Sequence, residues 1–238
     1  MYLMYNTELH CSDIVALGDT HSLPVISDIL RHYKIMNSII IGVGDHGEGF
    51  GCDDCVLEEL EEYLQETNNK FIAIRGNHSD PSYFKKEHKY NQKFQNIEFI
   101  EDYSIKTIND HVFLFVGGAI SIDRTERKEG RDYWSDEPFV LSDTYLDLPQ
   151  VDILVTHSAP ISAPPYGLTK IKYWLDRDVH LKDELITERK NIDILCQHVC
   201  PKINLYGHFH QVLSERVDDI YYRGLNINEL ISITNILR

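Results

Sequence analysis

Residues 39–45, Ile-Ile-Ile-Gly-Val-Gly-Asp, constrain the fold of this chain more than any other segment. They form an apolar run, rich in β-branched residues, that stops at a glycine and a carboxylate. Such runs are typical of buried strands in α/β sheets, which carry their chemistry just beyond the carboxyl ends of the strands. Asp45 therefore stands where a ligand or metal would bind, although Gly-Asp after a strand is also an ordinary turn.

Four further apolar segments, at 13–18, 70–74, 151–156 and 202–206, end in the same way. The potential metal ligands that follow them are Asp19 and His21, Asn77 and His78, His157, and His208 and His210. Each has an ordinary explanation on its own; Asp19, for example, could cap the next helix. Five strand ends that all carry such residues are improbable by chance, and they indicate one shared site. If residues 19–21 are extended, Asp19 and His21 face the same point.

The order of the predicted elements indicates an α/β fold. Helical patterns at 23–33 and 53–65 alternate with the first three strands, which is typical of parallel βαβ units. Later segments predict further strands at 97–101, 104–108 and 112–116, a helix at 182–200, and two or more strands within 211–238. The turns expected at 109–110 and 218–219 predict hairpins, so the sheet system should be mixed. We expect a single domain over 1–238.

The amino-acid composition indicates which binding partners and which cellular compartment to expect. The chain has 23 Lys and Arg against 38 Asp and Glu, a net charge of −15, which repels a nucleic-acid backbone. We therefore expect no duplex nucleic-acid binding, and without a long apolar run we expect no membrane span. Five cysteines cannot all pair, which favours the cytoplasm. A zinc site from Cys52, Cys55, Cys196 and Cys200 is an alternative to an ordinary buried helix face.

The donor types at the strand ends indicate the class of metal. Two carboxylates, one amide oxygen and several imidazoles suit manganese, iron, zinc or cobalt, whereas an oxygen-only magnesium or calcium cage would not use four histidines. Seven side chains also exceed what one tetrahedral zinc can use. Two metals that share a bridging carboxylate would use them all.

The five motifs together resemble those of the calcineurin-like metallophosphoesterases. They are DxH at 19–21, GD at 44–45, GNH at 76–78, a histidine at 157, and GHxH at 207–210, in the order of that family. The resemblance implies a four-layer αββα sandwich, two mixed sheets flanked by helices, with a metal site at the strand-end loops. It implies one metal held by Asp19, His21 and His210, a second by Asn77, His157 and His208, and Asp45 as the bridge.

The same resemblance implies a metal-dependent phosphoester hydrolase. Two divalent or trivalent ions, manganese first and iron, zinc, cobalt or nickel as alternatives, would generate a bridging hydroxide near neutral pH. The expected substrates are phosphomonoesters, small phosphodiesters or nucleotides, with a phosphoprotein possible. His78 would be the catalytic residue that protonates the leaving group.

Two residues also resemble the serine/threonine protein phosphatase branch, which is the alternative activity. Glu48 would be the carboxylate that pairs with His78, with Asp80 as runner-up. Arg75 would be a phosphate clamp, unless it forms a structural salt bridge instead.

The chain departs from that branch at two positions. Gly49 stands where the branch has arginine, and Ser79 stands where it has glutamate. The phosphate pocket is therefore incomplete unless another arginine fills the gap, for which the candidates are Arg124, Arg127, Arg131 and Arg223. The third hypothesis is a non-catalytic metal-binding scaffold. Such a protein would be expected to have lost some metal ligands, but here every ligand position of the family motifs is occupied. Specificity is expected from the loops at 119–137 and 161–178.

Overall fold

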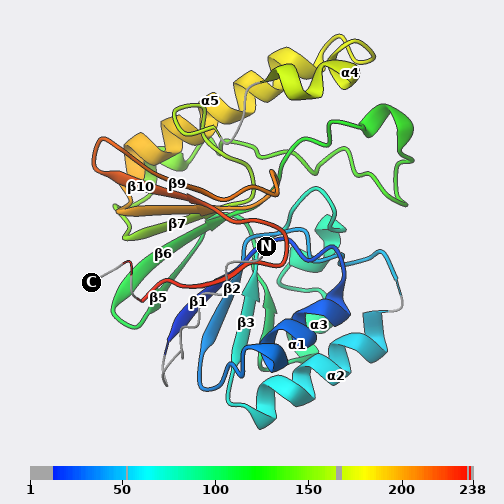
Figure 1. The fold of residues 1–238 in the computed structure, drawn as a ribbon, viewed down its shortest axis with the longest axis vertical. Coiled ribbons are helices and arrows are strands. Elements are labelled where there is room, and N and C mark those ends of the chain that lie inside the picture. The colour runs from blue at the N-terminus through cyan, green and yellow to red at the C-terminus, as the bar shows by residue number, and fades with distance from the viewer. Residues whose placement is uncertain (1–12, 52, 165–167, 235, 237–238) are drawn as a thin grey trace.

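Two β-sheets form the centre of the molecule in the computed structural model, which describes residues 13–51, 53–164, 168–234 and 236 (Figure 1). The first sheet has the order β11-β1-β2-β3-β4 and the second β5-β6-β7-β8-β10-β9. The strands of the first sheet are β1 Ile14–Leu17, β2 Ile39–Gly42, β3 Lys70–Ala73, β4 Ile97–Phe99 and β11 Leu230–Ser232. Those of the second are β5 Ser104–Ile108, β6 His111–Val116, β7 Ile153–Thr156, β8 Ile203–Tyr206, β9 Leu213–Val217 and β10 Ile220–Gly224.

Both sheets are mixed, as predicted. Strands β1 to β4 run parallel, and β11 lies antiparallel beside β1. In the second sheet β6, β7, β8 and β10 are parallel, while β5 and β9 are antiparallel at the edges. The two expected hairpins form, because Ile108 pairs with His111 and Val217 with Ile220. The chain thus places the carboxyl ends of its parallel strands together.

Helices cover the outer face of each sheet (Figure 1). The first sheet is covered by α1 Leu23–His32, α2 Asp53–Glu66 and α3 Lys89–Lys93, and the second by α5 Leu181–Val199. Successive side chains along a strand point to opposite faces of the sheet, which explains the layers. Val15 and Ile40 pack toward the helices, whereas Ile14 and Ile41 pack between the sheets. The four-layer αββα arrangement is therefore confirmed.

The loop at 119–137 and the described parts of the segment at 161–178, residues 161–164 and 168–178, lie beside this sandwich with little regular structure. The loop contains one short 3₁₀ turn, Arg124–Glu126, and the segment contains the turn Leu168–Ile171 and the helix α4 Lys172–Leu175. Ile120 of the loop packs against the buried face at the start of α5. Further 3₁₀ turns are Pro81–Phe84 and Tyr145–Asp147. None of the helices in the described parts of the chain is long and apolar enough to cross a membrane.

Candidate metal centre

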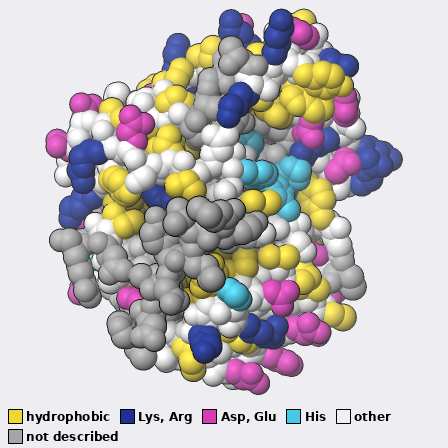
Figure 2. All heavy atoms as spheres, in the orientation of Figure 1, with side chains coloured by type: hydrophobic (Ala, Val, Ile, Leu, Met, Phe, Trp, Pro, Cys, Tyr) yellow, Lys and Arg dark blue, Asp and Glu magenta, His cyan; other side chains and the backbone are white. Residues whose placement is uncertain are grey.

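The predicted ligands meet beyond the carboxyl ends of β1, β2, β3, β7 and β8. Figure 2 shows histidine side chains gathered at one place on this face of the molecule. Among the described residues, three groups of side chains place their ligand atoms within 4.8 Å of one another. They are Asp19, His21 and His210; His21, Asp45 and His78; and Asp45, His157 and His208. Asp45 belongs to two of the groups.

The first group contains a close pair of imidazoles. His21 Nε2 lies 2.8 Å from His210 Nε2, and His210 Nε2 lies 3.2 Å from Asp19 Oδ2. Only one of two facing imidazole nitrogens can donate a hydrogen to the other. A cation bound among these atoms would accept a lone pair from each of the two imidazole nitrogens and from the Asp19 carboxylate. The main chain fixes the carboxylate, because the His208 N–H donates to Asp19 Oδ2 at 2.9 Å.

The group of Asp45, His157 and His208 is built around His157. Its Nδ1 lies 2.7 Å from the Val43 carbonyl, so the ring donates there and turns Nε2 toward the site. Nε2 lies 3.2 Å from Asp45 Oδ1 and 3.3 Å from Asn77 Oδ1. His208, the next member, is in ring contact with His157. This set therefore has two oxygens and two imidazoles directed to one point.

The backbone at the site is unusual. His21, Asp45, His208 and His210 all have positive φ, at 51°, 55°, 65° and 50°. Non-glycine residues seldom adopt this left-handed conformation, which costs about 1 kcal/mol or more each. The expectation that residues 19–21 are extended is therefore wrong. Asp19 and His21 converge because the backbone turns at His21, after β1 has ended.

Two motif glycines leave room for the carboxylates. A Cβ at Gly76 would lie 1.9 Å from Asp45 Oδ1, and a Cβ at Gly207 would lie 2.1 Å from Asp19 Oδ1. Neither distance is possible for real atoms, so any side chain here would displace the carboxylate. The glycines of GNH and GHxH are thus part of the site.

Burial and charge act on these groups in opposite directions. Burial alone would raise the pKa of Asp45, but His157 beside it holds that pKa well below the usual value. Burial lowers the pKa of His157, yet the charge of Asp45 outweighs it and raises the pKa to about 9. Burial lowers the pKa of His208 well below its usual value. Asp19 and Asp45 are both fully buried among imidazoles, and a bound divalent cation would take the place of the protons that now balance their charge.

Sequence reasoning missed the residue that orients Asn77. The Asn77 side-chain amide donates to Ser121 Oγ at 3.0 Å, which turns Oδ1 toward His157. Ser121 is itself fixed, because its N–H donates to Glu137 Oε1 at 2.7 Å. Burial raises the pKa of Glu137 to about 7. Only the polarity of the loop at 119–137 pointed here, since a serine has no recognisable spacing of its own.

His78 lies beside Arg127, not beside Glu48. Arg127 Nη2 is 2.8 Å from His78 Nε2, and Arg127 Nε is 2.7 Å from Asp123 Oδ1. Burial lowers the pKa of His78, and the charge of Arg127 lowers it further. Of the four candidate arginines, Arg127 is the one at the site. The others pair elsewhere: Arg124 with Asp178 and Glu184, Arg131 with Asp132, and Arg223 with Glu229.

Glu48 instead connects two loops of the site. It is fully buried, and its Oε2 accepts from Ser79 Oγ at 2.7 Å. The Asp80 N–H donates to the Glu48 carbonyl at 2.8 Å. Burial raises the pKa of Glu48 to about 8. The predicted pairing of Glu48 with His78 is therefore absent, and the runner-up Asp80 caps the turn Pro81–Phe84 through Ser82.

Arg75 is directed away from the site. Its Nε donates to Asp102 Oδ2 at 2.9 Å, and its two terminal nitrogens donate to the carbonyls of Asp136, Glu137 and Pro138 at 2.7–3.0 Å. The guanidinium is thus committed to the protein and holds the end of the loop at 119–137. This placement contradicts the phosphate-clamp prediction and agrees with the structural alternative.

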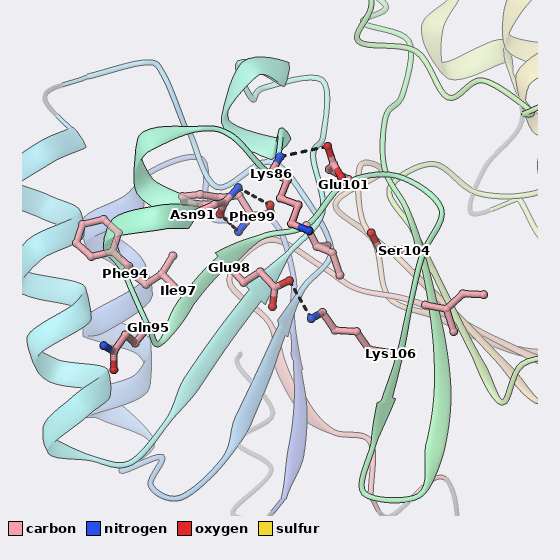
Figure 3. Close-up of a pocket in the computed structure, with 12 residues that line it drawn as sticks. Lys86, Asn91, Phe94, Gln95, Ile97, Glu98, Phe99, Glu101, Ser104 and Lys106 are labelled. Atoms are coloured by element: carbon pink, nitrogen blue, oxygen red, sulfur yellow. Dashed lines mark hydrogen bonds and ion pairs between the residues drawn. The ribbon is translucent and has the colours of Figure 1, made fainter.

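Two other features lie apart from the site. Cys55, Cys196 and Cys200 are free thiols and belong to none of the ligand groups found in the described part of the chain, while Cys52 lies outside it. A hollow of about 500 Å³ lies between edge strands β4 and β5 (Figure 3). Lys106 in this hollow pairs with Glu98 at 2.9 Å, and none of the predicted site residues lines it.

Comparisons with known proteins give the family and the fold of this chain. A profile of the calcineurin-like phosphoesterase family matches residues 10–212. One solved structure, with 12% sequence identity, covers 95% of this chain and 96% of its own length with a TM-score of 0.56, a likeness of fold. An archaeal phosphodiesterase matches at 15% identity over 93% and 98% of the two chains, TM-score 0.41. Phosphopantetheinyl hydrolase from Mycobacterium tuberculosis matches at 13% over 94% and 97%, TM-score 0.45. A search of curated protein sequences found no significant match.

Proposed function

The chain belongs to the calcineurin-like phosphoesterase family, and from this premise we propose that it hydrolyses phosphomonoesters or small phosphodiesters at a dinuclear metal centre. The observation that carries the proposal is the position of Asp45. Its carboxylate belongs both to the group with His21 and to the group with His157 and His208. A carboxylate shared between two sets of imidazoles can bridge two cations, which supports a two-metal site.

The residues divide into two ligand sets in this proposal. Asp19, His21 and His210 would hold one ion and Asn77, His157 and His208 the other, with Asp45 between them. When bound, two such ions bind phosphoryl oxygens, lower the pKa of water and offset charge that grows during displacement at phosphorus. Manganese is our first candidate, because the mixed oxygen and imidazole donors suit it.

His78 and Arg127 would bind and protonate the substrate. In the structure Arg127 Nη2 donates to His78 Nε2 at 2.8 Å, so this imidazole nitrogen is the acceptor before a substrate is bound. A phosphoryl oxygen that replaces this contact would accept from Arg127, and its negative charge would favour the protonated form of His78, which could then donate to the same group. His78 could then pass a proton to the departing oxygen. Arg127 would therefore be the residue that binds the phosphate, the role that the sequence predicted for Arg75.

The substrate expected from this site is small. The other candidate arginines, Arg124, Arg131 and Arg223, pair with carboxylates elsewhere, and Arg75 no longer supports the protein phosphatase alternative. We therefore favour a phosphorylated small molecule or nucleotide over a phosphoprotein. The free thiols support a reducing compartment such as the cytoplasm.

Hydrolysis of p-nitrophenyl phosphate and bis(p-nitrophenyl) phosphate tests the proposal. The metal-stripped protein would be assayed with and without added manganese. We expect turnover that depends on manganese, and the preferred ester would separate monoesterase from diesterase activity. No hydrolysis of either ester with manganese, iron, zinc, cobalt or nickel would refute the proposal and favour a non-catalytic scaffold.

A further inference from the structure

An aromatic wall, defined here as Phe50 and Trp134, stands beside His78. The ring centroids of Phe50 and Trp134 are 5.4 Å apart, and that of Phe50 is 6.0 Å from the His78 ring. Phe50 is 41% exposed although it is a large apolar residue next to a polar site. Neither residue has a role in the metal centre or in proton transfer. The two come from loops more than eighty positions apart in the sequence, so the fold brings them together.

The loop that carries Phe50 is fixed by its own backbone. The Phe50 N–H donates to the Gly47 carbonyl at 3.3 Å, and the Gly49 N–H donates to Asp53 Oδ2 at 2.7 Å. Gly49 has φ +86°, a conformation that favours glycine, and a Cβ there would meet Asp80 at 2.5 Å. This tight turn directs Glu48 into the protein while Phe50 stays exposed at the surface.

Trp134 is held by the residues that fix the second loop. Its carbonyl accepts from the Glu137 N–H at 3.0 Å, and the Glu137 carbonyl accepts from Arg75 Nη1 at 2.7 Å. Glu137 also accepts from the Ser121 N–H, so the same residue supports Asn77 and the position of Trp134. The backbone that carries each ring of the wall is therefore held by hydrogen bonds, and the two rings contact each other.

The position of the wall determines what would contact it. Arg127 and His78 are the donors available to a phosphoryl group, and a leaving group protonated by His78 must lie beside that ring. The Phe50 ring is 6.0 Å from the His78 ring, and the Trp134 ring lies on from Phe50 at 5.4 Å. Exposed aromatic rings stack well on planar aromatic groups, and such stacking tightens binding by roughly 5-fold or more per base.

We propose that Phe50 and Trp134 form a subsite for a planar aromatic group, a nucleobase or an aryl ring, carried by the ester side of a phosphate that Arg127 and His78 bind. This deepens the proposed function and rests on it. The wall selects the substrate and adds no chemical step. Sugar phosphates and other aliphatic esters would reach the same centre without this contact.

Tryptophan fluorescence gives a test that needs no turnover. The chain has two tryptophans, so Trp174→Phe leaves Trp134 as the only emitter. The metal-loaded variant would be titrated with two phosphonate analogues that cannot be hydrolysed, one of AMP and one of ribose 5-phosphate. We expect saturable quenching by the AMP analogue, with a Kd at least ~5-fold lower than that of the ribose analogue. In the Trp134→Phe control, Trp174 should not respond.

Kinetics give a second test in the protein that retains both tryptophans. The ratio of kcat/KM for AMP to that for ribose 5-phosphate should fall ~5-fold or more in Phe50→Leu and in Trp134→Leu. Tyr33→Leu, a change of another exposed aromatic residue outside the site, should leave the ratio unchanged. Equal Kd values for the two analogues, or an unchanged ratio in both wall variants, would overturn the subsite. If neither ester is hydrolysed, the proposed function fails, while the fluorescence titration still decides whether the subsite exists.

Discussion

Asn77 donates its side-chain amide to Ser121 Oγ at 3.0 Å, so a residue of the loop at 119–137 determines which atom of Asn77 faces the metal centre. Ser121→Ala would remove this partner and let the amide rotate. Outer partners of metal ligands are typically worth 10–100-fold in affinity or activity. We expect kcat/KM to fall roughly 10-fold and one metal to bind more weakly, as measured by steady-state kinetics and by titration with a chelator.

Ser142→Ala is the matched control, because Ser142 lies outside the site and is close to Thr144. It should leave both quantities unchanged. Equal metal affinity and activity in Ser121→Ala and the wild type would show that Asn77 is oriented by something else.

His78→Ala should separate metal binding from proton transfer. His78 is no member of the two proposed ligand sets, so the metal content should be kept. A general acid typically contributes 10²–10⁴-fold, and mainly for poor leaving groups. We expect a loss of roughly 100-fold or more on an alkyl phosphate but a smaller loss on p-nitrophenyl phosphate. Equal losses on the two esters would remove His78 from the role of proton donor; His32→Ala is the surface control.

Gly76→Ala should disrupt the site although it changes no ligand. The new Cβ would lie 1.9 Å from Asp45 Oδ1, so the carboxylate must move. We expect the variant to fold but to bind less metal, which mass spectrometry of the purified metalloprotein would measure. Gly51→Ala is the control. Its new Cβ would have only Asp53 Oδ1 nearby, at 3.7 Å, so this variant should bind metal normally. Full metal content in Gly76→Ala would contradict the packing described for GNH.

Glu188 should make stability depend on pH. It is buried on α5, its Oε2 accepts from the Phe139 N–H at 3.2 Å, and burial raises its pKa from 4.5 to about 7. A carboxyl whose pKa is raised by folding binds its proton more tightly in the folded state. This contribution is therefore full below pH 4.5 and is lost as the pH rises through about 7.

Glu188→Gln removes that titration. Relative to wild type, the free energy of unfolding of the variant should rise by roughly 3 kcal/mol between pH 4.5 and pH 8. Urea unfolding at several pH values would measure the difference. A difference between the two proteins that does not change with pH would mean that Glu188 is not held in its neutral form.

The sequence predicted the candidate site best at the residues that directly follow the apolar strands. Each strand that was predicted to present a ligand forms, and the ligands at 19, 45, 157 and 210 reach common groups, because parallel strands bring their carboxyl ends to one edge. The two hairpins could also be predicted from the local sequence, because the turn of a hairpin depends on residues that are adjacent in the chain.

The supporting contacts could not be predicted in the same way. Whether Arg75 or Arg127 faces the site depends on where the loop at 119–137 folds back, and that is decided by contacts with Glu137 and Asp102 rather than by spacing. The pairing of Glu48 with Ser79 likewise depends on how two loops pack. The left-handed backbone at His21 is a property of the assembled site and has no glycine to signal it.

Metal content of the wild type and of Asp45→Asn measures the central claim most directly. Both proteins would be loaded with manganese, freed of excess and analysed for metal per chain, with p-nitrophenyl phosphate hydrolysis measured in parallel. Asp80→Asn is the control, because Asp80 caps a turn outside the ligand groups. We predict about two metals per chain in the wild type and the control, as a two-metal site requires, and loss of both metal and activity in Asp45→Asn. Two metals and full activity in Asp45→Asn would contradict a bridging carboxylate at this position.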